Sequence, residues 1–253
     1  MLQYSDQFYR DIEDARPSAR VIVPLILDLI QPKTVIDIGC GTGVWLSVFK
    51  QYGVEDVWGV DGDCVDQQML KIPRERFTAF DLTRPFRLNR KFDLVMSIEV
   101  AEHLPAANAE SFVDSLVRLG DIILFSAAIP FQGGTNHLNE QWQTYWAELF
   151  KKNGYIAIDC IRNKIWNVDV LKVKRIYAQN MLLYAREDSL EYYPTLKNEV
   201  KNTRMDMLSI VHPKLYSSKI AYPPPEILSL SYTLSILPQI IKNAVLRRVK
   251  RVV

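Results

Sequence analysis

The stretch that most constrains the fold is a β-branched run followed directly by a glycine-rich turn. Residues 34–38 have the sequence Thr-Val-Ile-Asp-Ile, which is typical of a buried strand. Gly39, Gly41 and Gly43 follow at alternating positions, and an apolar helical pattern starts at Val44. Glycine permits positive φ and removes Cβ atoms that would keep a ligand away from the main chain. The stretch therefore predicts a strand, a turn and a helix, with a flat or anionic ligand held against backbone amides.

The spacing of this motif separates it from two other glycine-rich turns. It is Asp-x-Gly-x-Gly-x-Gly with no Lys-Ser/Thr after it, so it fits neither the dinucleotide pattern G-x-G-x-x-G nor the P-loop. It resembles the first motif of class I S-adenosylmethionine-dependent methyltransferases. The resemblance implies that S-adenosylmethionine is the cofactor and that these residues contact it: Asp37, Gly39, Cys40, Gly41 and Gly43. The alternative is a glycine turn that only links a strand to a helix.

Apolar runs alternate with helical patterns along most of the chain. Further strands are predicted at residues 54–60, 77–80, 92–98, 121–129, 155–160 and 180–185. This alternation predicts an α/β fold, a doubly wound Rossmann-like sheet of seven mostly parallel strands with helices on both faces. We expect a methyltransferase domain over residues 1–188, with an N-terminal helical cover that Pro24 kinks or starts. Residues 189–253 are expected to form an extended appendage.

Acidic residues follow the second and third predicted strands. Asp61, with Gly62 after it, is placed to accept both ribose hydroxyls of a bound nucleoside. Asp63 is the substitute if the strand ends later, and either residue can instead form a turn. The resemblance implies that Asp81 contacts the adenine amino group while Leu82 packs on the ring; the alternative is that Asp81 caps a helix or forms a turn.

The fourth predicted strand, which carries the candidate cofactor contact Ser97, runs directly into Glu99-Val-Ala-Glu102-His103. Ligands of open α/β sheets bind outside the carboxyl ends of the strands, so this segment lies at the mouth of the site. Glu99, Glu102 and His103, joined by His137 from the loop after the fifth-strand region, offer carboxylate and imidazole ligands that suit Mg²⁺ or Mn²⁺.

The Glu-x-x-Glu-His pattern resembles that of ubiquinone-biosynthesis O-methyltransferases and of small-RNA 3′-terminal 2′-O-methyltransferases. The resemblance implies a divalent metal chelated by adjacent hydroxyls of the acceptor. The candidates for catalysis are Glu102, His103 and His137, any of which can take the hydroxyl proton. The alternative is a site without metal, in which a histidine is the general base or only packs against the cofactor.

Composition and the chain ends bear on partners and location. Three scattered cysteines form neither a disulfide framework nor a zinc cluster, and no positively charged start leads into an apolar core, so we expect a cytoplasmic protein. Residues 236–253 carry an apolar helical stripe with basic residues beside it, which is typical of peripheral contact with an anionic membrane or of docking on the domain. Without a basic stripe on the catalytic domain, nucleic acid is not expected as a partner.

These features together favour an O-methyltransferase. We expect the acceptor to be a sugar hydroxyl of a glycan or glycolipid, because a metal site of this kind favours vicinal hydroxyls and the chain also resembles polysaccharide-associated methyltransferases. The runner-up acceptor is an aromatic or quinone-like hydroxyl, for which Trp142, Tyr145, Trp146 and Trp166 could line a pocket. An alternative from another class is an inactive cofactor-binding module that acts as a scaffold.

Overall fold

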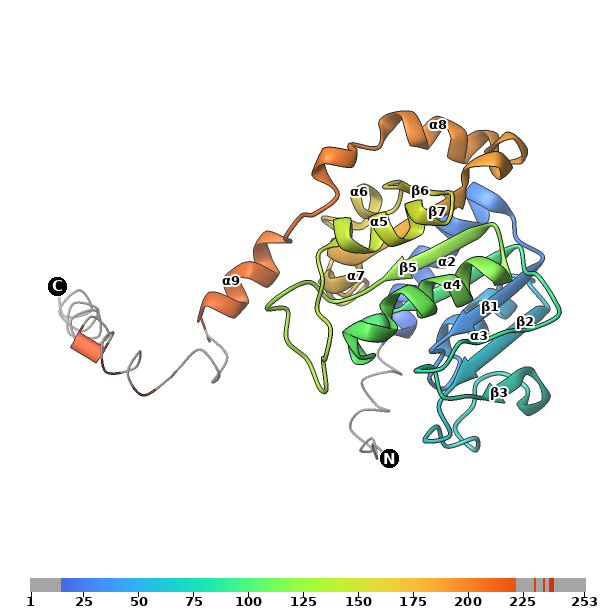
Figure 1. Cartoon of the computed structure of the whole chain (residues 1–253), viewed down its shortest axis with the longest axis horizontal. Helices are drawn as coiled ribbons and strands as arrows, with labels where there is room; N and C mark the ends of the chain where they lie inside the picture. The colour runs from blue at the N-terminus through green and yellow to red at the C-terminus, as the bar shows by residue number, and fades with distance from the viewer. Residues whose placement is uncertain (1–14, 222–229, 231–233, 235–236, 239–253) are drawn as a thin grey trace. The chain divides into compact units, whose positions relative to one another are not determined.

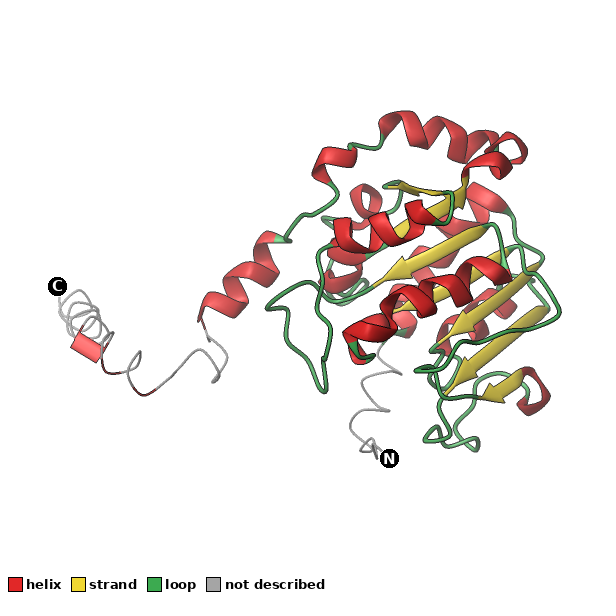
Figure 2. Cartoon of the chain, viewed as in Figure 1, coloured by secondary structure: helices red, strands yellow, loops and turns green. Residues whose placement is uncertain are grey.

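The computed structural model describes residues 15–221 together with 230, 234, 237 and 238. It separates the chain into two compact units, Met1–His212 and Pro213–Val253. In the larger unit, strands run through the middle and helices lie on both sides of them (Figures 1 and 2). No helix in the described part of the chain is long and apolar enough to cross a bilayer.

The larger unit is organised around one seven-stranded sheet of order β3-β2-β1-β4-β5-β7-β6. The strands are β1 (Thr34–Ile38), β2 (Asp56–Asp61), β3 (Phe77–Ala79), β4 (Leu94–Ile98), β5 (Ile122–Ser126), β6 (Tyr155–Ile158) and β7 (Leu182–Arg186). Strands β1 to β5 pair in parallel, whereas β7 pairs antiparallel with β5 and β6. The predicted Rossmann-like, mostly parallel sheet is confirmed.

Helices occupy the segments between the strands. The α-helices are α2 (Arg16–Ile30), α3 (Val44–Gln51), α4 (Ala109–Leu119), α5 (Gln143–Lys152), α6 (Arg162–Ile165), α7 (Arg175–Asn180), α8 (Pro194–Asn202) and, in the smaller unit, α9 (Pro213–Ala221). Short 3₁₀ turns are η1 (Arg74–Arg76), η2 (Ala101–His103), η3 (Ala106–Asn108), η4 (Glu187–Tyr192) and η5 (Met205–Met207).

The core lies on both faces of the sheet because successive strand residues point to opposite sides. In β1, Val35 packs in the apolar cluster formed with α2 and α3, whereas Ile36 packs in the cluster formed with α4 and α5. Burial on both faces explains why the strands are almost continuously apolar. It also leaves the carboxyl ends of the parallel strands as the place for polar chemistry.

Helix α2 lies against the sheet with an apolar stripe that includes Ile22, Val23 and Ile26. It begins at Arg16, with a proline in its first turn, so Pro24 lies inside the helix and does not start it. Residues 1–14, which belong to the expected N-terminal cover, lie outside the described part of the chain.

Residues 189–212 are not the extended appendage that the sequence suggested. They form helical segments within the larger unit, and Leu196 and Leu208 are buried there. The buried guanidinium of Arg162 donates to the carbonyl of Leu208 (2.8 Å), which holds this segment against the domain. The structure thus places the separation of the two units after His212 rather than after residue 188. Apart from residues 237 and 238, the expected basic helix over residues 236–253 lies outside the described part.

Candidate active site

The glycine turn links β1 to α3, and all three glycines of the motif have a positive φ angle. The φ angles are 88° at Gly39, 54° at Gly41 and 81° at Gly43. A Cβ on Gly39 would lie 2.3 Å from Cγ2 of Val100, so this glycine lets the turn after β4 pack against the turn after β1. The motif therefore also joins two halves of the site, a role that the spacing alone did not predict.

Asp61 ends β2 and contacts the glycine turn. Its two carboxylate oxygens accept the backbone N–H groups of Gly41 and Gly62, each at 2.6 Å. Burial raises the pKa of Asp61, and the two N–H donors lower it in part. Asp61 is therefore held rigidly at the strand tip, where a carboxylate can accept ribose hydroxyls; Asp63 is exposed.

Three further candidate cofactor residues are buried next to the turn. Asp37 is 2% exposed, and burial, followed by the charge of Asp61, raises its pKa well above the usual value. Burial likewise raises the pKa of the Cys40 thiol, which makes it an inert packing group rather than a nucleophile. Ser97 is fully buried in β4, and its hydroxyl makes no hydrogen bond within the described residues.

The structure places Asp81 in an exposed turn. Its Oδ1 accepts both the backbone N–H (3.0 Å) and the hydroxyl (2.7 Å) of Thr83, and this hydroxyl hydrogen bond lowers the pKa of Asp81. Asp81 thus forms a turn, which was the alternative expectation, and its contact with adenine stays a prediction. Leu82 packs at the edge of the apolar cluster with α4 and α5, which leaves it half-buried.

Glu99 does not join the other candidate metal ligands. It has a left-handed backbone (φ 54°), and its carboxylate accepts hydrogen bonds from the side-chain amides of Gln132 (3.2 Å) and Asn180 (3.1 Å). Strain of this kind in a non-glycine residue persists only where surrounding contacts enforce it, often at functional sites. The expected set of four ligands is therefore reduced to three by the amide clamp on Glu99.

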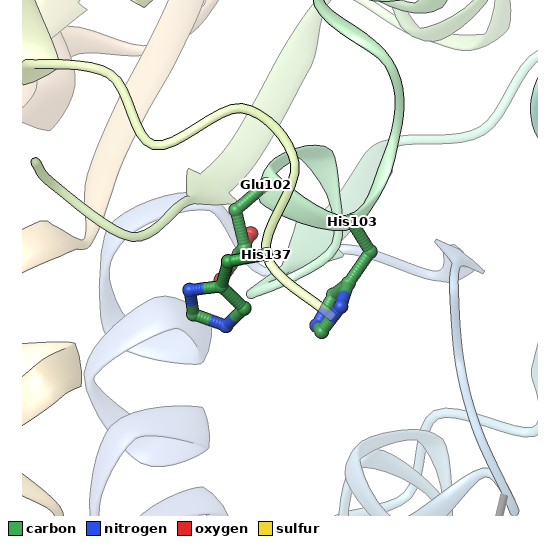
Figure 3. Close-up of side chains that lie close together, drawn as sticks. All are labelled: Glu102, His103 and His137. Atoms are coloured by element: carbon green, nitrogen blue, oxygen red, sulfur yellow. The ribbon is translucent and has the colours of Figure 1, made fainter. Parts of the chain in front are cut away.

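Three of the candidate residues lie close together beyond the carboxyl end of β4: Glu102, His103 and His137 (Figure 3). Each offers a ligand atom within 4.8 Å of the others, and the two imidazole rings stand edge to face with centroids 4.9 Å apart. Glu102 and His103 lie on η2 directly after β4, and His137 comes from the loop after β5. The convergence of these three predicted residues follows from the neighbouring positions of β4 and β5 in the sheet.

The electrostatics of this cluster are those of a desolvated site. Both carboxylate oxygens of Glu102 and Nδ1 of His103 are buried without a hydrogen-bond partner among the described residues. Burial, and then the charge of Glu99, raises the pKa of Glu102 well above its usual value; burial, and then His137, lowers the pKa of His103. Such orphaned lone pairs fit a metal ion, a proton donor or an acceptor hydroxyl.

Three residues of the site were missed by the sequence reasoning. Gln132 and Asn180 hold Glu99, and Glu140 accepts a hydrogen bond from His137 at 2.8 Å. The spacing His137-x-x-Glu140 was a local signal, because residues three apart in a tight loop can meet. No local signal pointed to Asn180, which lies 81 positions from Glu99.

The sheet order, the glycine turn and Asp61 at the tip of β2 define a Rossmann-like class I S-adenosylmethionine-dependent methyltransferase. The chain belongs to the methyltransferase domain family, whose model matches residues 12–159. No curated protein sequence matches the chain.

Among solved structures, DesVI of Streptomyces venezuelae is similar, with 14% identity, coverage of 73% of this chain and 99% of that one, and a TM-score of 0.50. The magnesium protoporphyrin IX methyltransferase of Synechocystis PCC 6803 with bound SAH is 20% identical over 74% of this chain and 89% of that one (TM-score 0.49). The methyltransferase domain of bacterial CtHen1 is 21% identical over 67% and 97% (TM-score 0.48). At 14% identity the likeness to DesVI bears on the fold alone.

Proposed function

We propose that this methyltransferase transfers a methyl group to a sugar hydroxyl of a glycan or glycolipid. The observation that carries the proposal is the cluster of Glu102, His103 and His137, whose lone pairs converge just beyond β4. A hydroxyl oxygen is a weak nucleophile until its proton is removed, and buried lone pairs beside it can accept that proton. Burial lowers the pKa of His103, which favours the neutral imidazole, the form that can accept a proton.

The cofactor end is assigned to the glycine turn and Asp61. S-adenosylmethionine supplies an electrophilic methyl group when bound. The backbone of Gly41 and the carboxylate of Asp61 form one hydrogen-bonded unit there, and Val100 packs between the glycine turn and η2. This contact fixes the cofactor end relative to the acceptor end, which is the positioning that a displacement reaction needs.

The cluster also fits a divalent metal of the Mg²⁺ or Mn²⁺ type as part of the proposal. Glu102 and His103 have orphaned buried lone pairs, and one oxygen with two nitrogens is a mixed donor set for a divalent metal rather than an all-oxygen one. A metal there would lower the pKa of a coordinated hydroxyl. Glu99 is left out of this set because Gln132 and Asn180 hold it.

Exposed apolar side chains on the loop after β5 favour an acceptor with an apolar part. Phe131 is 73% exposed and Leu138 is 62% exposed, and both lie within the loop that carries His137. Trp142, 40% exposed, ends the same loop. Large apolar groups gathered next to a polar site mark a binding surface more often than isolated ones do. The same observation keeps an aromatic or quinone-like hydroxyl as the second candidate acceptor.

The test is methyl transfer from isotopically labelled S-adenosylmethionine by the purified full chain, with free sugars, alkyl glycosides and a catechol as acceptors. We expect transfer to the alkyl glycosides, and a loss of about 100-fold or more in Glu102→Gln. Glu110→Gln is the matched control, because Glu110 is exposed and pairs only with a surface lysine, Lys152, in the described structure.

Each of the other outcomes favours a different function or mechanism. Transfer to the catechol alone would replace the sugar with the aromatic acceptor. Binding of S-adenosylhomocysteine by calorimetry without transfer to any acceptor would favour the scaffold. Full activity in excess chelator would remove the metal from the proposal and leave His103 or His137 as the base.

A further inference from the structure

Glu140 contacts His137 from within the same loop. Oε1 of Glu140 lies 2.8 Å from Nδ1 of His137 and also accepts the backbone N–H of Gly133 at 2.7 Å. Both side chains are largely withdrawn from solvent, with exposures of 12% for His137 and 19% for Glu140. One carboxylate oxygen therefore joins the backbone of Gly133 to the imidazole of His137 within this loop.

This contact decides which nitrogen of His137 carries the proton. An ionised carboxylate only accepts hydrogen bonds, so Nδ1 of a neutral His137 must be the donor to Glu140. The proton then resides on Nδ1, and the lone pair is left on Nε2. A histidine that binds a metal or takes a proton through Nε2 needs this tautomer.

The surrounding backbone keeps the ring in place. A Cβ on Gly134 would lie 2.2 Å from Nε2 of His137, so the ring occupies space that only glycine leaves open. The N–H groups of Leu138 and Asn139 both donate to the carbonyl of Glu102, at 2.7 and 3.0 Å. The loop backbone is thus attached directly to the turn that carries the rest of the cluster.

We propose that Glu140 is a positioning residue that holds His137 in the Nδ1–H tautomer and so leaves the lone pair of this histidine on Nε2. The inference rests on the proposed role of His137 in acceptor chemistry and goes beyond it by assigning the group that orients this histidine. It holds whether Nε2 binds a metal or accepts a proton, because both uses require the same lone pair.

The tautomer can be measured by ¹⁵N-correlated NMR of the full chain with labelled histidine, in chelator and at a pH where the imidazoles are neutral. The chain has three histidines, and the spectra of His103→Asn and His212→Asn assign them. His212 is an internal contrast: its Nε2 lies 3.1 Å from the carbonyl oxygen of Trp166, which can only accept. We expect Nε2–H at His212 and Nδ1–H at His137.

Variants then test the cause. We expect Glu140→Ala to move the proton of His137 to Nε2 in most molecules, and Glu140→Gln, which keeps an acceptor oxygen, to restore Nδ1–H. Gly134→Ala, at a position whose backbone is not left-handed, should shift the ring signals of His137 and leave those of His212 unchanged. Glu110→Ala is the control for loss of a carboxylate elsewhere.

Two results would overturn the inference: Nε2–H at His137 in the unmodified chain, or retention of Nδ1–H in Glu140→Ala. The first needs no variant, so a variant that fails to fold does not remove the test. Binding of S-adenosylhomocysteine, followed by calorimetry in the same samples, reports on the methyltransferase proposal separately, because Glu140 has no contact with the glycine turn or Asp61 among the described interactions.

Discussion

Two carboxylates on either side of β1 show how differently the two ends of this site are built. Asp61, at the tip of β2, is half-buried and accepts two backbone N–H groups. Glu102, in the turn after β4, is 1% exposed and accepts no hydrogen bond from the described residues. Burial raises the pKa of both groups, and the charge of Glu99 raises the pKa of Glu102 further.

This difference distinguishes the cofactor end, which is built for binding, from the acceptor end, which is built for reaction. The cofactor end is made mainly from backbone whose conformation the glycines permit, and its carboxylate Asp61 is satisfied by two backbone N–H groups. The acceptor end is made from side chains that fold into a desolvated space, at a cost in stability of about 1–3 kcal/mol for an unsatisfied buried polar group. Proteins retain such costs where function requires them.

A substitution in the glycine turn should have the largest effect on stability and on cofactor binding. Gly39→Ala puts a Cβ 2.3 Å from Cγ2 of Val100 at a φ of 88°, so we expect a loss of about 2–5 kcal/mol in the free energy of unfolding from strain plus overpacking. Urea denaturation measures this loss, and calorimetry should show no binding of S-adenosylhomocysteine.

Gly53→Ala is the control for Gly39→Ala, because Gly53 also has a left-handed φ (92°) but no atom lies within 4 Å of a Cβ there. It should show the strain alone, about 1 kcal/mol. Val100→Ala should partly restore Gly39→Ala. Equal losses in the two glycine variants would mean that the contact with Val100 contributes nothing.

Removing the unsatisfied carboxylate should change stability in the opposite direction. Glu102→Met keeps a side chain of similar length and removes the buried, unsatisfied carboxyl group, so we expect the free energy of unfolding to rise by about 1–3 kcal/mol in chelator. Methyl transfer should fall by about 100-fold or more in the same variant. Glu110→Met, at an exposed position, should leave the free energy of unfolding close to that of the unmodified chain. A destabilised Glu102→Met would contradict the contrast with Asp61.

The sequence predicted those parts of the site that depend on local spacing. The glycine turn and Asp61 were predicted because their conformations are set by a few neighbouring residues, and Glu102, His103 and His137 because parallel strands end at one edge. The clamp on Glu99 could not be predicted, since it depends on the side-chain rotamers of distant residues such as Asn180. Residues 189–212 were misjudged because their few apolar residues, such as Leu196, are buried by tertiary packing without forming a strong helical stripe.

The smallest effect concerns Asp37, the buried carboxylate of the cofactor end with one orphaned oxygen. Burial, and then the charge of Asp61, raises its pKa in the folded chain well above the ordinary 3.8. Below pH 3.8 the carboxyl is protonated in both states, so it makes no pH-dependent contribution to stability. As the pH rises from 3.8 towards the pKa of Asp37 in the folded chain, the unfolded chain ionises first, so the folded state progressively loses stability.

Asp37→Asn has no carboxyl to titrate at this position. Its free energy of unfolding should therefore begin to exceed that of the unmodified chain above about pH 4, and the difference should reach about 1 kcal/mol at neutral pH. Urea denaturation of both proteins without cofactor, at steps from pH 3.5 to 7, measures the difference. A gap that is constant with pH would mean that Asp37 is ionised at its ordinary pKa, and the cofactor end would then hold its carboxylates at no cost.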